Sequence, residues 1–129
     1  CNGVYGYRLS NPPVLLVACL RASLDLFDAA SMKKLREKSK LLTAYLQVLL
    51  MKKLQEKISI ITPFAEDDRG CQLSIVFDQD VEPINEKLKA NNIICDVRKP
   101  NVLRIAPAPL YNSFRDVFCI CSALQEILS

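Results

Sequence analysis

The stretch VLRIAPAPLYNSF, residues 102–114, begins as an apolar strand and carries a single charge, Arg104, in its middle. An arginine keeps its proton, so a guanidinium among apolar residues needs an anion, and a planar carboxylate fits its fork of donors. Pro107 and Pro109 then end the strand, because proline has no N–H to donate to a sheet. The residues alone leave two roles open for Arg104: a structural ion pair with an Asp or Glu of the chain, or an anchor for an anionic ligand.

Two helices are predicted in the first half of the chain. The pair Pro12-Pro13 suits a helix start, where the missing N–H groups cost nothing, and Ser10 or Asn11 can cap it. Apolar residues occupy most of the circumference from Val14 onward, so we expect this helix to be largely buried. A second helix is predicted from Ser31, as its cap, to about residue 53, because leucines recur there at helical spacing.

The second half of the chain predicts a sheet with two more helices. Apolar residues alternate or cluster as in strands over 58–62, 72–77, 93–97 and 102–106, and residues 4–7 are either irregular or a short edge strand. A short helix capped by Asp78 or Asp80 ends at Asn91-Asn92, and the last helix begins at Ser113 with Asp116 completing a capping box. The predicted order is ααββαββα. It indicates an α+β two-layer domain with a short, mostly antiparallel sheet and helices covering one face.

The charges are concentrated in the second predicted helix. The chain of 129 residues carries +3 in total, whereas residues 31–57 hold eight basic and two acidic residues, a local charge of +6. No aromatic residues alternate with the lysines, as they do in many nucleic-acid-binding surfaces. We interpret this basic helix as a solvated face, with binding of a polyanion as the alternative.

The composition argues against catalysis by this chain alone. It has no histidine, three glycines and six cysteines without metal-ligand spacing, so no nucleophile–histidine pair, glycine-rich phosphate loop or metal site is expected. We expect the cysteines to be reduced and the chain to be cytoplasmic. The apolar run 14–20 is much shorter than the ~20 residues that span a bilayer, so no membrane partner is expected.

Three segments together resemble one enzyme family. GYRLSNPP at residues 6–13, RGCQL at 69–73 and RIAPAPLYNSF at 104–114 resemble the corresponding segments of kynureninases, in the same order. The resemblance extends over essentially the whole chain. It implies one domain over 1–129, the C-terminal small domain of a fold-type-I pyridoxal-phosphate enzyme related to class V aminotransferases. Residues 1–57 would be a leading segment with two helices and 58–129 the sheet with two helices, while the large cofactor domain lies outside this chain.

The resemblance also implies a reaction and site residues. Kynureninases hydrolyse L-kynurenine or 3-hydroxy-L-kynurenine to anthranilate or 3-hydroxyanthranilate and L-alanine, in tryptophan catabolism and NAD biosynthesis. Arg104 matches the arginine that holds the substrate α-carboxylate. Asn11 matches the asparagine that lies over the cofactor and the substrate ring, and Ser10 matches its neighbour, so Asn11 is expected near Arg104 in space.

The same resemblance implies what these residues lack. No lysine of the chain matches the family's Schiff-base lysine, so pyridoxal 5'-phosphate would be bound mainly by the large domain, and the 129 residues alone would be inactive. The implied partners are a kynurenine-type amino acid and a second copy of the intact protein in a homodimer, without nucleic acid. Two other functions remain open: a free-standing, non-catalytic module that binds an amino acid or a partner through Arg104, and a polyanion-binding basic helix.

Overall fold

A computed structural model describes residues 3–7 and 10–129, which divide into two units, Cys1–Met32 and Lys33–Ser129. Cys1 and two residues of the GYRLSNPP segment, Arg8 and Leu9, lie outside the described residues. No helix within the described ranges is both long and apolar enough to cross a membrane.

The N-terminal unit consists of a short 3-10 helix, η1 (Gly3–Tyr7), followed by the helix α1 (Val14–Ala30). Of the two alternatives left open for residues 4–7, the short edge strand is therefore wrong. Helix α1 begins directly after the two prolines, as predicted, but Pro13 takes the N-cap position, so the predicted cap by Ser10 or Asn11 is also wrong.

The prediction that α1 is largely buried is wrong as well. None of its residues is buried, and Leu15 remains 82% exposed. The N-terminal unit contains too little chain besides α1 to build a core, and a helix buries its apolar residues only where other elements cover them. The apolar side chains of α1 therefore do not pack into a core within this unit.

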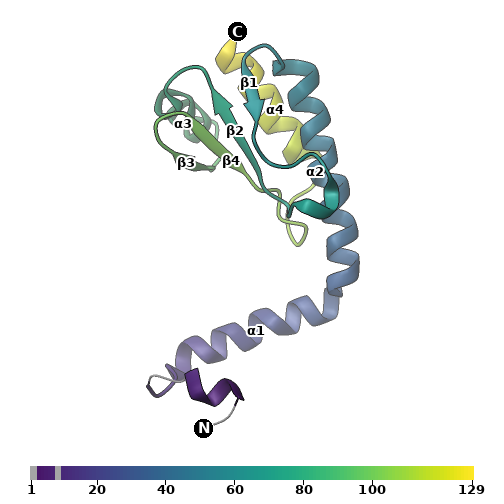
Figure 1. Ribbon diagram of the computed structural model, residues 1–129, viewed down its shortest axis with the longest axis vertical. Coiled ribbons are helices and arrows are strands. Elements are labelled where there is room, and N and C mark those ends of the chain that lie inside the picture. Colours follow the sequence, from purple (N-terminus) through teal and green to yellow (C-terminus); the bar gives the residue numbers. More distant parts are fainter. Residues whose placement is uncertain (1–2, 8–9) are drawn as a thin grey trace. The chain divides into compact units, whose positions relative to one another are not determined.

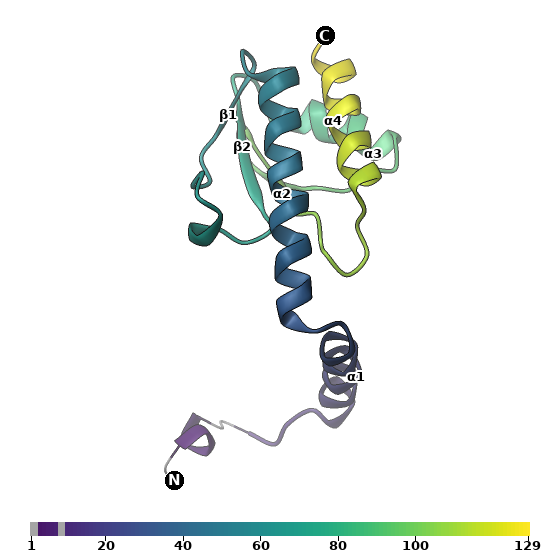
Figure 2. The same cartoon turned by 90° about the vertical axis from the view of Figure 1, so that its right-hand side faces the viewer.

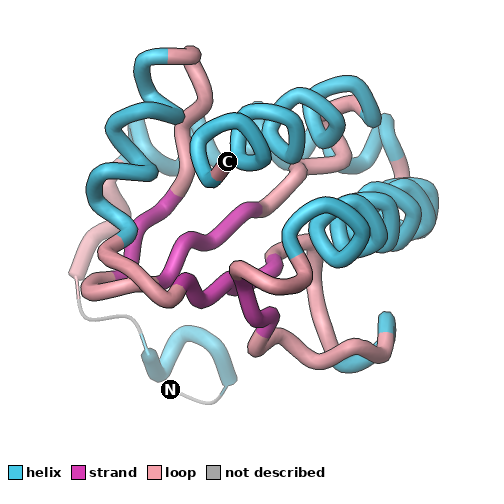
Figure 3. The backbone as a smooth tube through the Cα atoms, turned by 90° about the horizontal axis from the view of Figure 1, so that it is seen from above, coloured by secondary structure: helices cyan, strands magenta, loops and turns pink. Residues whose placement is uncertain are grey.

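The second unit has the predicted order of helices and strands (Figure 1). Its four strands form one antiparallel sheet in the order β1-β2-β4-β3, and Figure 3 shows them as one layer with helices packed along one side. The two-layer α+β prediction is confirmed. The elements are α2 (Met32–Leu54), β1 (Ile58–Ile60), η2 (Glu66–Asp68), β2 (Leu73–Phe77), α3 (Val81–Ala90), β3 (Asp96–Arg98), β4 (Val102–Ile105) and α4 (Phe114–Leu128).

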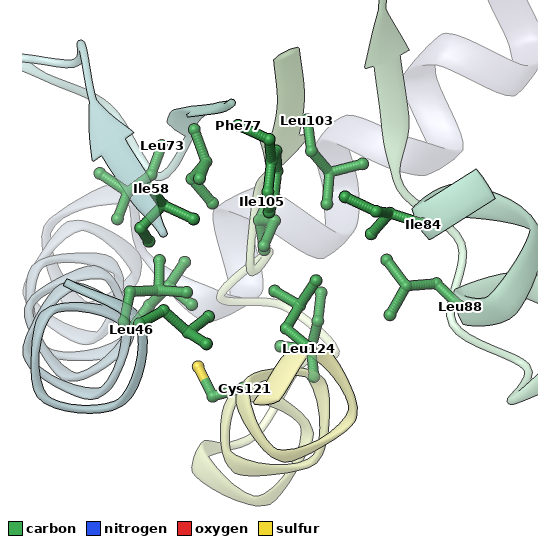
Figure 4. Packing of buried hydrophobic residues seen from close by; sticks show 14 of the residues in the cluster. Leu46, Ile58, Leu73, Phe77, Ile84, Leu88, Leu103, Ile105, Cys121 and Leu124 are labelled. Carbon is green, nitrogen blue, oxygen red and sulfur yellow. The ribbon is translucent and has the colours of Figure 1, made fainter. Parts of the chain in front are cut away.

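The core lies between the sheet and the three helices α2, α3 and α4. On β2, Leu73, Ile75 and Phe77 are buried and alternate with half-buried residues, as the pattern predicted. Figure 4 shows Leu46 of α2 and Leu124 of α4 facing these strands, and Figure 2 shows α2 and α4 running side by side. Burying each such side chain contributes roughly 1.5–3 kcal/mol, so this interface holds the unit together.

Strand β3 differs from its predicted range of 93–97. The backbone N–H of Ile93 donates to the carbonyl of Leu88 at 3.0 Å, so the chain is still bonded to the end of α3 at that point. The strand starts later, at Asp96, and extends to Arg98, which the sequence had placed in a turn. Asp96 and Arg98 are two apart in this strand and therefore share one face of the sheet.

Candidate functional site

Arg104 lies on the face of the sheet opposite to the helices. Its neighbours on β4, Leu103 and Ile105, are buried in the core, and side chains alternate between the two faces along a strand. The strand register places Ser74 of β2 and Asp96 of β3 directly beside Arg104, one on each side. The charge is thus half-buried on the open face of the sheet and does not enter the hydrophobic core.

Asp96 provides the anion that the sequence required for Arg104. Its Oδ2 atom pairs with Nη2 of Arg104 and, at 3.2 Å, with Nη2 of Arg98. The structural ion pair, one of the two roles left open, is therefore present. The three side chains together carry a net charge of +1, so one negative charge can still be accommodated beside them.

The ion pair does not use all the donors of Arg104. Its Nε is buried and has no hydrogen-bond partner among the described residues, and the ion pair with Asp96 joins its Nη2 to Oδ2. An arginine has five N–H donors in a fixed fork. Arg104 therefore retains the capacity to bind a second carboxylate while Asp96 holds one edge.

A cavity of about 600 Å³ opens beside Arg104. Its volume is in the range of small-molecule sites. Arg104 is the only cationic residue among the described residues of its wall, which is otherwise mainly apolar or neutral. The lining comes from β3, β4, the segments next to them and the start of α4: Gln72, Asn92, Ile93, Ile94, Cys95, Asp96, Arg104, Ile105, Ala106, Pro107, Asn112, Asp116, Val117, Cys119 and Ile120.

The proline-rich segment after Arg104 is fixed by hydrogen bonds. The side-chain Oδ1 of Asn112 accepts from the Ala108 N–H at 2.8 Å, and the Asn112 N–H donates to the Ala108 carbonyl at 2.8 Å. These bonds form a turn, since the Tyr111 N–H also donates to the Ala108 carbonyl at 3.3 Å. The loop that follows Arg104 and forms part of the cavity wall is therefore held in one conformation by its own hydrogen bonds.

The start of α4 carries the predicted capping box. The Ser113 N–H donates to Oδ2 of Asp116 at 2.7 Å, and the Asp116 N–H donates to Oγ of Ser113 at 3.3 Å. The hydrogen bonds from Ser113 hold the pKa of the Asp116 carboxyl below its usual value. This cap fixes the start of α4, and the first two turns of that helix contribute Asp116, Val117, Cys119 and Ile120 to the cavity.

Two thiols are made unreactive by their surroundings. Burial raises the pKa of Cys95, which lines the cavity, and of Cys121, in the core, to about 11 each. A neutral thiol is a poor nucleophile and a poor metal ligand, so neither is suited to covalent catalysis. The described residues contain no group of three or more His, Cys, Asp or Glu that could hold a metal ion.

The basic helix uses part of its charge inside the chain, which the sequence did not reveal. Arg36 donates to the carbonyl of Arg69 at 3.0 Å, Lys38 to that of Pro109 at 2.8 Å, and Lys40 pairs with Asp67 at 2.6 Å. The contact with Lys40 lowers the pKa of Asp67. These partners lie 27 to 71 residues away, so no local pattern could have indicated them.

The structure does not test whether Ser10 and Asn11 belong to this site. Both are exposed and directly precede the two prolines in the N-terminal unit, whereas Arg104 and its cavity belong to the second unit. Their placement near the substrate and cofactor remains a prediction. Asp96 and Arg98, in contrast, were not among the predicted site residues. A signal existed, because both charges lie on the strand that was expected to precede the Arg104 strand.

Comparison with protein families gives a match over most of the second unit. The family model described as "Kynureninase C-terminal domain" matches residues 35–124. Curated relatives named kynureninase are 46% identical in Homo sapiens, 47% in Nematostella vectensis and 47% in Myxococcus xanthus. These alignments cover 95–98% of this chain and 29% of each relative, so the chain spans less than a third of the length of the proteins it matches.

Comparison with solved structures supports the fold. A chain named "NIFS-LIKE PROTEIN" superposes with a TM-score of 0.64 at 20% sequence identity. The match covers 74% of this chain and 28% of that one. At this identity the likeness is evidence for the shared architecture alone.

Proposed function

The chain belongs to the kynureninase family as its C-terminal domain, and from this we propose that it forms the part of a kynureninase that binds the substrate α-carboxylate. The reaction of the whole protein would be hydrolysis of L-kynurenine or 3-hydroxy-L-kynurenine to the corresponding anthranilate and L-alanine. The observation that carries the proposal is Arg104, the one cation that the described residues contribute to the wall of a cavity large enough for such a substrate.

Arg104 would orient the substrate as well as bind it. A guanidinium that holds a carboxylate through two parallel hydrogen bonds fixes the plane of that carboxylate. The rest of the amino acid then has a defined direction relative to the protein, which is how positioning lowers a reaction barrier. Among the described residues of the wall, which also include the carboxylates of Asp96 and Asp116, Arg104 carries the one positive charge that attracts an anion.

The described residues of the second unit fit the carboxylate end of the substrate and not the cofactor. The part of the cavity wall that the described residues form has no lysine for covalent attachment and no second cation for a phosphate group. Pyridoxal phosphate, when bound, supplies an electron sink for breaking the Cβ–Cγ bond. We infer that the groups holding it lie mainly in the part of a whole kynureninase beyond the matched segment.

Ser10 and Asn11 are proposed to act on the other side of the substrate. The side-chain amide of Asn11 has donors and an acceptor without a charge, which suits contact with the polar edges of an aromatic substrate and of the cofactor. As the resemblance implies, the whole protein would be a homodimer in the cytoplasm.

A chimera tests the carboxylate role. The chain would replace the matching C-terminal segment of human kynureninase, and Arg104→Ala would be compared with the unmodified chimera. Loss of charged hydrogen bonds worth about 1.5–3 kcal/mol should lower kcat/KM for L-kynurenine by roughly 10- to 100-fold, mainly through KM. Lys89→Ala is the matched control, because Lys89 forms a surface pair with Glu86 on α3. An unchanged kcat/KM in Arg104→Ala would exclude the role.

A further inference from the structure

Asp96 shares one carboxylate oxygen between two arginines on the open face of the sheet. It stands directly opposite Arg104 in the pairing of β3 with β4, and Arg98 lies two residues further along β3 on the same face. Both Nη2 atoms contact Oδ2 of Asp96. We name these three side chains the Asp96 trio.

Stability does not explain this arrangement. The Arg104 and Asp96 side chains are 33% and 46% exposed. Ion pairs with such exposure contribute only about 0–1 kcal/mol to folding. Asp96 does, however, hold the guanidinium of Arg104, whose side chain otherwise has several rotatable bonds. A side chain that is ordered before the ligand arrives loses less conformational entropy on binding.

The charge balance decides whether Asp96 supports or opposes an incoming carboxylate. A single Arg–Asp pair would be neutral and would offer an anion little net attraction. Arg98 supplies the second positive charge, so the trio remains at +1 and one carboxylate brings it to neutrality. The buried Nε of Arg104 has no partner among the described residues, so Asp96 does not hold the guanidinium through both Nε and Nη2.

We propose that Asp96 is a positioning residue, which holds Arg104 in the orientation that receives the substrate carboxylate while Arg98 prevents Asp96 from cancelling the charge of Arg104. This inference rests on the proposed role of Arg104. It adds a residue that does not touch the substrate and acts only through Arg104.

The experiment is a double-mutant cycle in the same chimera with L-kynurenine. Asp96→Asn removes the charge and keeps the size, so KM should rise roughly 5- to 10-fold while kcat stays within about twofold, as expected when preorganisation of a binding group is lost. Asp96→Glu should recover most of the affinity. In the Arg104→Ala background, Asp96→Asn should have no further effect on KM, because its target is already gone.

Glu86→Gln, which removes a carboxylate from a surface ion pair on α3, is the control and should leave KM unchanged. Calorimetric titration with L-alanine, the product that keeps the α-carboxylate and is not hydrolysed, should give the same ranking of affinities without relying on turnover. If Arg104→Ala leaves KM unchanged, the proposed function fails. If Arg104→Ala raises KM but Asp96→Asn leaves it unchanged or lowers it, only the positioning role of Asp96 is overturned.

Discussion

Lys38 of α2 donates a hydrogen bond from Nζ to the carbonyl of Pro109, 71 residues later, at 2.8 Å. The contact joins the long basic helix to the loop that follows Arg104. Because that loop also closes on itself through Asn112 and Ala108, Lys38 and Asn112 restrain it from two sides.

Replacing Lys38 should loosen this loop without unfolding the domain. Lys38→Met keeps the length of the side chain and removes the donor, so we expect faster hydrogen exchange at the Tyr111 and Asn112 amides and a loss of stability of at most about 1 kcal/mol. Hydrogen exchange with mass spectrometry measures the first and urea unfolding the second. Lys34→Met, an exposed change on the same helix, is the control. Equal exchange in both variants would show that Lys38 does not restrain the loop.

The capping box predicts a dependence of stability on pH. The pKa of Asp116 is lowered in the folded chain by the hydrogen bonds from Ser113, so its contribution is complete above the unfolded-state pKa and is lost as the pH falls through the lower folded-state value. Asp116→Asn should therefore be less stable than the unmodified chain at pH 7, and the difference should shrink in acid. Urea unfolding from pH 7 to pH 2 measures it.

Two substitutions at Ser113 complete that test. Ser113→Ala removes the N-cap and should lower stability by about 1 kcal/mol at pH 7, whereas Ser113→Thr keeps the hydroxyl and should lower it less. A difference between Asp116→Asn and the unmodified chain that stays constant with pH would contradict the assignment.

The thiols should react in an order set by their surroundings. Cys119 is exposed, whereas the pKa of Cys95 and of Cys121 is raised to about 11 by burial. At pH 8 only about one in a thousand of the Cys95 and Cys121 side chains is a thiolate, so iodoacetamide should alkylate Cys119 well before them. Peptide mass spectrometry over time gives the three rates. Labelling of Cys95 as fast as Cys119 would show that the cavity is open to solvent at its base.

The sequence predicted the second unit because its hydrophobic periods are unambiguous. Helix α2 is indicated by leucines at helical spacing, and strand β2 by the alternation of Leu73, Ile75 and Phe77. The capping residue Ser113 marks the start of α4. Arg104 was identified as a residue needing an anion for a reason that is equally local, namely a charge within an apolar strand.

The remaining features depend on contacts that no local pattern encodes. The burial of α1 was overestimated because an apolar helix becomes buried only where other elements cover it. Asp96 was missed because its pairing with Arg104 depends on the register between β3 and β4, and that strand begins three residues later than its apolar residues suggest. The anchoring contacts of Arg36, Lys38 and Lys40 similarly join distant segments.

Strand β3 lies at the edge of the sheet and has only three residues, two of which are charged. Short edge strands with charged side chains discourage a second chain from adding its own strand and so protect a sheet against aggregation. The charges of Asp96 and Arg98 therefore also make β3 a poor template for an added strand, apart from the proposed positioning of Arg104 by Asp96. Any variant at these two positions has to be checked for self-association before its kinetics are compared.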